Sequence, residues 1–135
     1  MDEIARILVV DDEVNIRGAL VRLLQKAGHQ AEGAASGTEA LARFQAEPFD
    51  LVLTDVRMKG MNGLDLLRAV KDLRPETEVL VMTAYAAVEA AVEAMRRGAY
   101  DYLVKPLDLS RLPLLVARVI DRQRIAAENR RLRER

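Results

Sequence analysis

Four short runs of apolar residues occur along the chain, and each run stops at a polar residue. They cover residues 7–10, 51–53, 79–82 and 102–104. Every position inside them is apolar, whereas a strand with one wet face alternates between apolar and polar side chains. Runs of this kind are typical of strands that are covered on both faces of a parallel sheet. The segment at 30–34 predicts a fifth, weaker strand.

Between the strands, apolar residues recur at the three- and four-residue spacing of a buried helix face. Gly28 and Gly98 fit C-terminal caps, Ser36 to Glu39 fits a capping box, and Pro75 ends the third helix. The first four helical stripes consist of Ile16, Leu20, Leu23, Leu24 and Ala27; Leu41 and Phe44; Leu64, Leu67 and Val70; and Val88, Ala91, Val92 and Met95.

The fifth helix is predicted to be the longest. It begins near Asp108 or Ser110, and Pro113, which is tolerated in a first turn, favours Ser110 as the cap. No helix breaker follows before the end of the sequence. We therefore expect a domain at residues 1–120 and a helical linker at 121–135 that leads toward a further effector domain.

The apolar residues of this linker leave two interpretations open. Past Ile120 they thin to Ile125, Leu132 and two alanines. These positions suit a short coiled-coil seam in which Asn129 sets the register. A solvated helical linker explains the same pattern equally well, because two heptads are few for such a seam.

Five strands that alternate with five helices predict an α/β fold, a doubly wound parallel sheet with helices on both faces. The length of 135 residues suits one domain, and an apolar content of 50% excludes a disordered chain. The 21 basic and 21 acidic residues balance, which excludes a strongly basic nucleic-acid binder. No apolar run approaches the roughly 20 residues of a membrane span, and no secretory signal is present. We expect a cytoplasmic protein with no membrane partner.

Five polar side chains follow the ends of four predicted strands. Asp11 and Asp12 come after the first strand, Asp55 after the third, Thr83 after the fourth and Lys105 after the fifth. In open parallel sheets, ligands bind beyond the carboxyl ends of the strands. We therefore expect these five residues to face one crevice.

The charges of this crevice predict a metal site. Three carboxylates and one ammonium sum to −2, and two like charges ~4 Å apart repel by ~4 kcal/mol at an effective dielectric constant of ~20. The sequence contains no cysteine and a single histidine, so the ligands are oxygens. Oxygen ligands favour a hard divalent ion, Mg²⁺ first and Mn²⁺ or Ca²⁺ less so.

A divalent ion beside a carboxylate, a lysine and a hydroxyl suits phosphoryl transfer, in which an aspartate attacks and forms an acyl phosphate. Taken singly, each residue has a simpler explanation: an aspartate or threonine after a strand is usually a helix cap or turn residue. Lys105 alone is most simply a solvated lysine. The prediction depends on their joint placement at the strand ends.

The sequence resembles the receiver domain of two-component response regulators. The resemblance runs from about residue 5 to 120 and is carried by the motifs at 8–13, 53–58, 81–84 and 98–106, which read LVVDDE, LTDVRM, VMTA and GAYDYLVKP. It implies a flavodoxin-like fold with strand order 2-1-3-4-5.

The resemblance also implies a role for each residue of the metal site. Asp55 matches the phosphoacceptor and Asp12 a direct Mg²⁺ ligand. Asp11 matches a carboxylate that binds the metal largely through water. The backbone carbonyl of Arg57 matches a further ligand.

Other matches concern the phosphoryl group and the switch. Thr83 and Lys105 match the phosphoryl-binding pair, and the bond between Lys105 and Pro106 matches one that is cis in this family. Tyr102 matches an aromatic residue whose ring turns inward when the threonine moves.

The sequence also departs from the family pattern. Lys59 stands where many relatives have proline, which affects the stiffness of the loop. Arg57 and Tyr85 occupy positions that tune the loss of the phosphoryl group to water. Both side chains are bulky, which predicts slow self-dephosphorylation.

The run from Thr83 to Tyr102 resembles the NtrC-like branch in particular, whose members join a receiver to an AAA+ ATPase and a DNA-binding domain and activate sigma-54-dependent transcription. This chain contains no GxxxxGK[ST] loop, so we expect neither ATPase activity nor direct DNA binding from it. The implied partners are a sensor histidine kinase and a second copy of the chain. The dimer would use the fourth helix, fifth strand and fifth helix, the C-terminal helix, or both.

Three alternatives remain beside this interpretation. The first is a receiver of another response-regulator class. The second is an Mg²⁺-dependent phosphatase with an aspartate nucleophile, which needs a further acid or base; Glu13 is the only extra carboxylate expected near the crevice. The third is a flavin-binding or structural protein of the same architecture, which the 4% aromatic content disfavours. The receiver interpretation implies no enzyme activity beyond self-phosphorylation and slow self-dephosphorylation.

Overall fold

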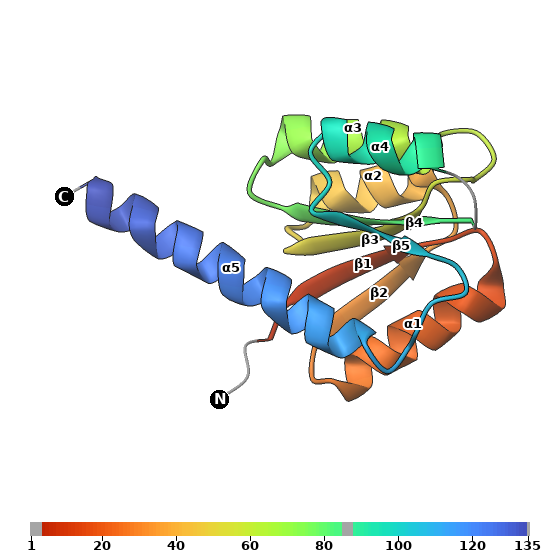
Figure 1. The fold of residues 1–135 in the computed structure, drawn as a ribbon, viewed down its shortest axis with the longest axis horizontal. Coiled ribbons are helices and arrows are strands. Elements are labelled where there is room, and N and C mark those ends of the chain that lie inside the picture. Colours follow the sequence, from red (N-terminus) through yellow and green to blue (C-terminus); the bar gives the residue numbers. More distant parts are fainter. Residues whose placement is uncertain (1–3, 85–87, 135) are drawn as a thin grey trace.

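A computed structural model of the chain describes residues 4–84 and 88–134. Five parallel strands form one sheet in the order β2-β1-β3-β4-β5, which confirms the predicted fold class and strand order (Figure 1). The strands are β1 (Arg6–Val10), β2 (Gln30–Ala34), β3 (Leu51–Asp55), β4 (Glu78–Thr83) and β5 (Asp101–Val104).

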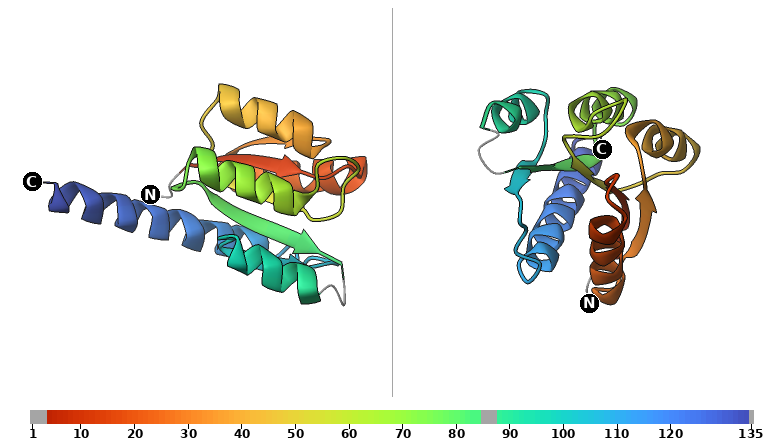
Figure 2. Two further views of the ribbon diagram at one scale, coloured as in Figure 1. Left: turned by 90° about the horizontal axis from the view of Figure 1, so that it is seen from above. Right: turned by 90° about the vertical axis from the view of Figure 1, so that its right-hand side faces the viewer.

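Helices cover both faces of this sheet (Figure 2). One face packs against α1 (Val14–Lys26) and the first half of α5 (Leu112–Arg133). The other face packs against α2 (Gly37–Ala46), α3 (Gly63–Leu73) and α4 (Val88–Arg96). None of the described helices is long and apolar enough to cross a membrane.

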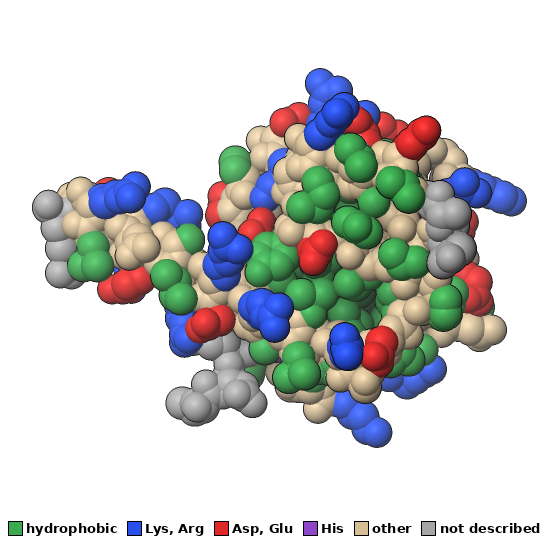
Figure 3. Space-filling view, in the orientation of Figure 1, with side chains coloured by type: hydrophobic (Ala, Val, Ile, Leu, Met, Phe, Trp, Pro, Cys, Tyr) green, Lys and Arg blue, Asp and Glu red, His purple; other side chains and the backbone are tan. Residues whose placement is uncertain are grey.

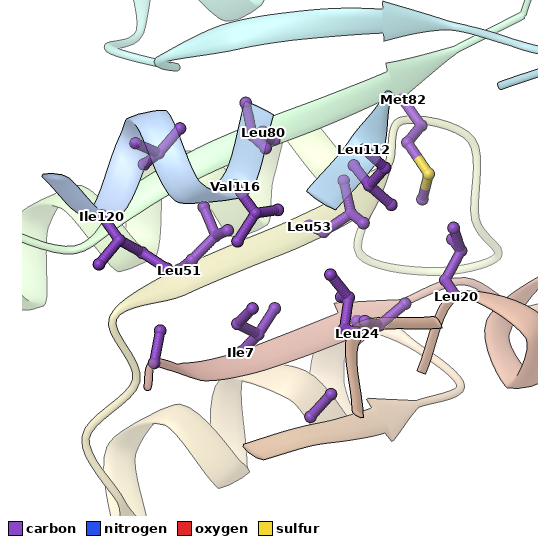
Figure 4. Packing of buried hydrophobic residues seen from close by; sticks show 14 residues of the cluster. Ile7, Leu20, Leu24, Leu51, Leu53, Leu80, Met82, Leu112, Val116 and Ile120 are labelled. Carbon is purple, nitrogen blue, oxygen red and sulfur yellow. The ribbon is translucent and has the colours of Figure 1, made fainter. Parts of the chain in front are cut away.

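The core consists of two apolar layers, one on each side of the sheet. In Figure 4, side chains of β1, β3 and β4 meet those of α1 and α5. The three central strands are buried on both faces, as their unbroken apolar runs predict. Burial of these runs holds the strand ends in place and therefore also fixes where the polar residues that follow the runs lie.

The sequence signals at the helix ends are correct for α1 and α2. The hydroxyl oxygen of Ser36 accepts a hydrogen bond from the Glu39 amide at 3.1 Å, and the Glu39 carboxylate accepts one from the Ala35 amide at 2.6 Å. Gly28 follows the end of α1 with a φ of 99°, a left-handed conformation that glycine adopts without strain.

The predicted start of α5 is wrong. The helix begins at Leu112, and Arg111 precedes it without a side-chain cap. Ser110 instead donates its hydroxyl and amide protons to the Asp108 carboxylate, at 2.6 and 3.1 Å. The two candidate caps therefore bond to each other in the turn before the helix. Pro113 does lie in the first turn, as expected.

The expectation of two covered faces is also wrong for β5. Tyr102 and Val104 are 41% and 44% exposed. This strand lies at the edge of the sheet, and its outward side chains line one groove together with the helical residues Val88, Val92 and Met95, which are exposed as well. Figure 3 shows hydrophobic side chains gathered on this face, over α4, β5 and the start of α5.

The second half of α5 extends away from the body of the molecule (Figure 1). Its residues beyond Asp121 are mostly exposed, including Ile125 and Leu132. Gln123 attaches the helix to the domain: its side-chain amide donates to the carbonyl oxygens of Asp50 at 2.7 Å and Glu76 at 3.1 Å. The helix is therefore tied to the loops before β3 and β4 at the end of the sheet opposite the predicted crevice.

We expect the substitution Gln123→Ala to loosen this attachment. The loss of two hydrogen bonds at an exposed site should lower the free energy of unfolding by about 1 kcal/mol. Amide hydrogen exchange should rise in residues 121–133 and change little in the central strands. Asn129→Ala, farther along the same helix, is the control. Equal exchange in both variants would contradict the proposed attachment.

Candidate functional site

The five predicted polar residues gather at one edge of the sheet. Asp11 and Asp12 follow β1, Asp55 is the last residue of β3, and Thr83 is the last residue of β4. Lys105 follows β5, the edge strand beside β4. All five strands are parallel, so the residues after their carboxyl ends share this edge.

Lys105 joins two of the carboxylates. Its Nζ lies 2.8 Å from Oδ2 of Asp55 and 3.2 Å from Oδ2 of Asp11. The carboxylates of Asp11, Asp12 and Asp55 each offer one oxygen, and these oxygens lie within 4.8 Å of one another. Residues from strands that are far apart in the sequence therefore form a single acidic cluster, which we call the acidic crevice: Asp11, Asp12, Asp55 and Lys105.

Burial strengthens the electrostatic interactions in the acidic crevice. Asp11 is fully buried and Asp55 is 8% exposed, whereas Asp12 faces the solvent. Burial lowers the pKa of the Lys105 ammonium, but its hydrogen bonds to Asp55 and Asp11 outweigh this effect and raise the pKa above its ordinary value. Lys105 is therefore cationic at neutral pH and offsets only part of the negative charge.

Backbone amides orient the two buried carboxylates. The Glu13 amide donates to Oδ1 of Asp11 at 3.0 Å, and the Arg57 amide donates to Oδ1 of Asp55 at 3.2 Å. Glu13 is also the N-cap of α1, where its carboxylate accepts a hydrogen bond from the Asn15 amide. The extra carboxylate expected near the crevice is thus engaged in the helix cap.

The donor set of the acidic crevice suits a hard metal ion. All three acidic ligands offer oxygen, and the four charged groups sum to −2. A divalent cation would bring that sum to zero and remove the repulsion between the carboxylates. The residues present therefore fit Mg²⁺ or a similar ion.

Thr83 and the residues of β5 lie beside the acidic crevice. Thr83 is 2% exposed, and its carbonyl oxygen accepts a hydrogen bond from the Lys105 amide at 2.8 Å. The bond between Lys105 and Pro106 is cis. Tyr102 pairs in register with Val81 and points outward. Tyr85 lies outside the described residues.

An apolar groove lies between α4 and the outward face of β5. We call it the β5 groove, and its lining includes Thr83, Val88, Val92, Met95, Tyr102 and Val104. Thr83 therefore belongs both to the edge that carries the acidic crevice and to this surface. A displacement of Thr83 would act on both places.

Sequence reasoning overlooked two residues that support the crevice. Arg17 of α1 donates from Nη1 to the carbonyl oxygen of Asp11 at 2.8 Å. Gly63 of α3 packs so closely that a Cβ there would lie 2.1 Å from the carbonyl oxygen of Asp55. A basic residue less than two turns after the acidic pair was the available signal for Arg17.

Comparison with known proteins agrees with this geometry. Residues 7–117 match the family described as the response regulator receiver domain. The chain belongs to this family. Receiver domains are phosphorylation-dependent switches, not enzymes in the usual sense, and their partners are histidine kinases.

The most similar proteins include longer transcriptional regulators. The chain is 42% identical over 120 residues to the transcriptional regulatory protein ZraR of Klebsiella oxytoca, covering 89% of this chain and 27% of that protein. It is 42% identical over 134 residues to the regulatory protein AtoC of Escherichia coli, covering 99% and 29%. The NtrX crystal structure from Brucella abortus with ADP superimposes with a TM-score of 0.91 at 36% identity, covering 96% and 30%.

These relatives place the receiver in the NtrC-like branch. The chain spans less than a third of the length of each of the three proteins. The comparisons therefore describe the receiver part of those proteins only.

Proposed function

We propose that Asp55 of this receiver accepts a phosphoryl group from a sensor histidine kinase. The observation that supports this most directly is the contact of Lys105 with both Asp55 and Asp11, at 2.8 and 3.2 Å. A carboxylate, a fixed cation and two further acids at one strand edge are the parts that phosphoryl transfer to aspartate needs.

The reaction follows from the chemistry of these groups. An Asp55 carboxylate oxygen attacks phosphorus, the bond between phosphorus and the kinase imidazole nitrogen breaks, and the nitrogen keeps its electron pair. Asp55 needs no general base, because a carboxylate is ionised at neutral pH. Lys105 neutralises charge on the phosphoryl oxygens, and the hydroxyl of Thr83 donates a hydrogen bond to one of them.

Mg²⁺ is the proposed cofactor, with Mn²⁺ as a substitute, and it supplies charge neutralisation for the transferred group. We assign Asp12 and Asp55 as direct ligands, Asp11 as a ligand largely through water, and the backbone carbonyl of Arg57 as a further ligand. The oxygen chemistry of the acidic crevice supports this assignment.

Mg²⁺ should therefore raise the midpoint of thermal unfolding. It binds the folded crevice and not the unfolded chain, so a concentration of 100 times Kd should stabilise the protein by about 2.7 kcal/mol. Differential scanning calorimetry with and without Mg²⁺ measures the shift. Asp12→Asn should lose most of it and Lys59→Ala should keep it. An unchanged midpoint at saturating Mg²⁺ would rule out the site.

Phosphorylation should change the surface beside Thr83. The added group carries a charge of about −2 and strong acceptor oxygens, which draw the Thr83 hydroxyl inward. Tyr102 then turns into the space near Thr83, and the β5 groove closes or reshapes. Such a switch selects between two packings that differ by a few kcal/mol.

This surface is also the proposed dimer contact. The exposed apolar residues of α4 and β5, with α5, suit a second copy of the chain, and the exposed Ile125 and Leu132 suit a second contact along the helix. Sedimentation velocity with and without a phosphodonor should show a change in the monomer–dimer equilibrium. A monomer under both conditions at high concentration would exclude both contacts.

We further propose that residues 1–120 form the receiver domain and residues 121–135 a helical linker to a sigma-54-dependent AAA+ activator in the cytoplasm. The NtrC-like relatives and the continuous α5 support this assignment. The bulky Arg57 and Tyr85 should slow the loss of the phosphoryl group to water.

Intact mass with a small phosphodonor and Mg²⁺ tests the proposed function. The expected product is one phosphoryl group per chain that persists after the donor is removed. Rapid, repeated consumption of the donor without a lasting product would instead indicate a phosphatase.

A further inference from the structure

Arg17 reaches from α1 to the end of β1, where the acidic pair begins. Its Nη1 donates to the carbonyl oxygen of Asp11 at 2.8 Å. β1 ends at Val10, so this carbonyl lies beyond the last residue of the strand. The guanidinium supplies a side-chain donor at the point where regular strand structure stops.

This hydrogen bond completes the fixation of Asp11. The amide of Asp11 donates to the Ala34 carbonyl at 3.2 Å. The carboxylate accepts from the Glu13 amide and from Lys105. With Arg17 on the carbonyl, every polar group of Asp11 has a partner.

The same contact bears on Asp12. The carbonyl of Asp11 and the amide of Asp12 belong to one rigid peptide plane. A fixed carbonyl therefore fixes the direction in which Asp12 leaves the strand. Asp12 is exposed, so packing does little to hold its carboxylate among the other two.

The path of the Arg17 side chain is built into β2. A Cβ at Gly33 would lie 3.0 Å from both Cγ and Cδ of Arg17, so the arginine stem crosses the strand at the place where no side chain stands. Gly33 pairs in register with Val9, close to the acidic pair. Two positions on different elements thus serve one contact.

We propose that Arg17 is a positioning residue that holds the Asp11–Asp12 peptide in the orientation that binds the divalent cation, and that Gly33 keeps its path open. This inference rests on the proposed function, because it takes the acidic crevice as the Mg²⁺ site. Arg17 acts through the backbone of Asp11 and touches neither metal nor phosphoryl group.

A simple charge argument predicts the opposite effect. A guanidinium that contacts the backbone of the acidic crevice repels a divalent cation there, so removal of its charge should tighten Mg²⁺ binding. Removal of a positioning contact should weaken binding instead, and loss of a hydrogen bond behind a ligand typically costs about tenfold or more in metal affinity. Loss of Arg17 should therefore lower the Kd for Mg²⁺ if its charge dominates and raise the Kd if its positioning role dominates.

Isothermal titration calorimetry with Mg²⁺ distinguishes them in the whole chain. Arg17→Met should raise the Kd for Mg²⁺ about tenfold. Gly33→Ala, which keeps the arginine and its charge, should raise Kd by a smaller factor. Arg17→Lys keeps the charge and most of the aliphatic part of the side chain, so its Kd for Mg²⁺ should lie between those of the wild type and Arg17→Met.

Two matched controls come from the same helix. Arg22→Met removes one charge from an exposed position of α1, and Gly18→Ala adds a Cβ whose nearest neighbours are the guanidinium atoms at the flexible end of Arg22. Both should leave Kd unchanged. Far-UV circular dichroism of every variant shows whether it is folded.

Labelling by an acyl phosphate provides the second measurement. For Arg17→Met, the Mg²⁺ concentration that gives half the maximal rate should rise in parallel with Kd, while the rate at saturating Mg²⁺ should return to near the wild-type value. A general folding defect would lower the saturating rate instead. Any one of three results would overturn the positioning role alone. They are a lowered saturating rate for Arg17→Met, a lower Kd for Mg²⁺ in Arg17→Met, and an unchanged Kd in both Arg17→Met and Gly33→Ala. Absence of Mg²⁺ binding by the wild-type chain would overturn the proposed function as well.

Discussion

The substitution Asp55→Asn should abolish phosphorylation of the chain by a small phosphodonor. An amide oxygen is a poor nucleophile, and the other carboxylate that contacts Lys105, that of Asp11, is fully buried and lies farther from the ammonium, at 3.2 Å against 2.8 Å for Asp55. The wild-type chain should gain one phosphoryl group per molecule in the presence of Mg²⁺, and the variant should gain none. Intact mass spectrometry, followed by peptide mapping of the wild-type product, measures both results.

Lys59→Ala is the matched control for this experiment. Lys59 is exposed in the loop that follows β3 and belongs to neither the acidic crevice nor the core, so its loss should leave labelling intact. Labelling of Asp55→Asn at the wild-type level, or a modified peptide that lacks residue 55, would place the phosphoacceptor elsewhere. The assignment of Asp55 would then be wrong, although the metal site could remain correct.

Much of the site could be predicted because each central strand is an apolar run that is followed by polar residues. An unbroken apolar run has to be covered on both faces, which sets its place in the middle of a parallel sheet. The polar residues that follow such a run must then stand at or near the carboxyl edge. Asp11 comes directly after its run and Asp55 comes one residue after Thr54, and the structure brings both within hydrogen-bonding distance of Lys105.

The expectation that both faces of a strand are covered fails at the edge of the sheet. The run at 102–104 is as apolar as the central runs, but β5 has a neighbour on one side only, and Tyr102 and Val104 are exposed. The apolar pattern of a strand shows that its side chains favour burial, but it does not show whether other elements of the fold cover them. Here the unsatisfied preference belongs to the surface that we assign to the switch and the dimer.

The sequence near the start of α5 failed to predict where the helix begins, for a different reason. Asp108 and Ser110 are both good N-cap residues, and each was a reasonable candidate. In the structure the serine donates to the aspartate, so neither caps the helix. Two capping residues within three positions can bond to each other, and here the turn that precedes the helix uses both of them.

Contacts made by side chains away from the strand ends could not be predicted. Gln123 bonds to carbonyl oxygens near residues 50 and 76, and Arg17 crosses β2 at Gly33. Nothing in the sequence around Gln123 or Gly33 distinguishes them from other surface residues. Their roles depend on which loop or strand the fold places opposite them.

Gly63→Ala should have the largest effect on stability of the substitutions considered. A Cβ at this position would lie 2.1 Å from the carbonyl oxygen of Asp55 and 2.9 Å from Cα of Val56. Both neighbours are backbone atoms, and the Gly63 amide is itself bonded to the Val56 carbonyl at 2.9 Å. Because no flexible side chain can give way, β3 and α3 must move apart. Such overpacking should cost about 3 kcal/mol or more.

Gly60→Ala separates this steric effect from the general cost of losing a glycine. Gly60 has a φ of 75°, and a Cβ there meets nothing within 4 Å, so its substitution should cost only about 1 kcal/mol of backbone strain. Urea unfolding gives both free energies. If Gly63→Ala costs no more than Gly60→Ala, the close approach of α3 to Asp55 is wrong. If it costs more, as we expect, phosphorylation should also slow in the folded fraction, because the strand end that carries the acceptor will have shifted.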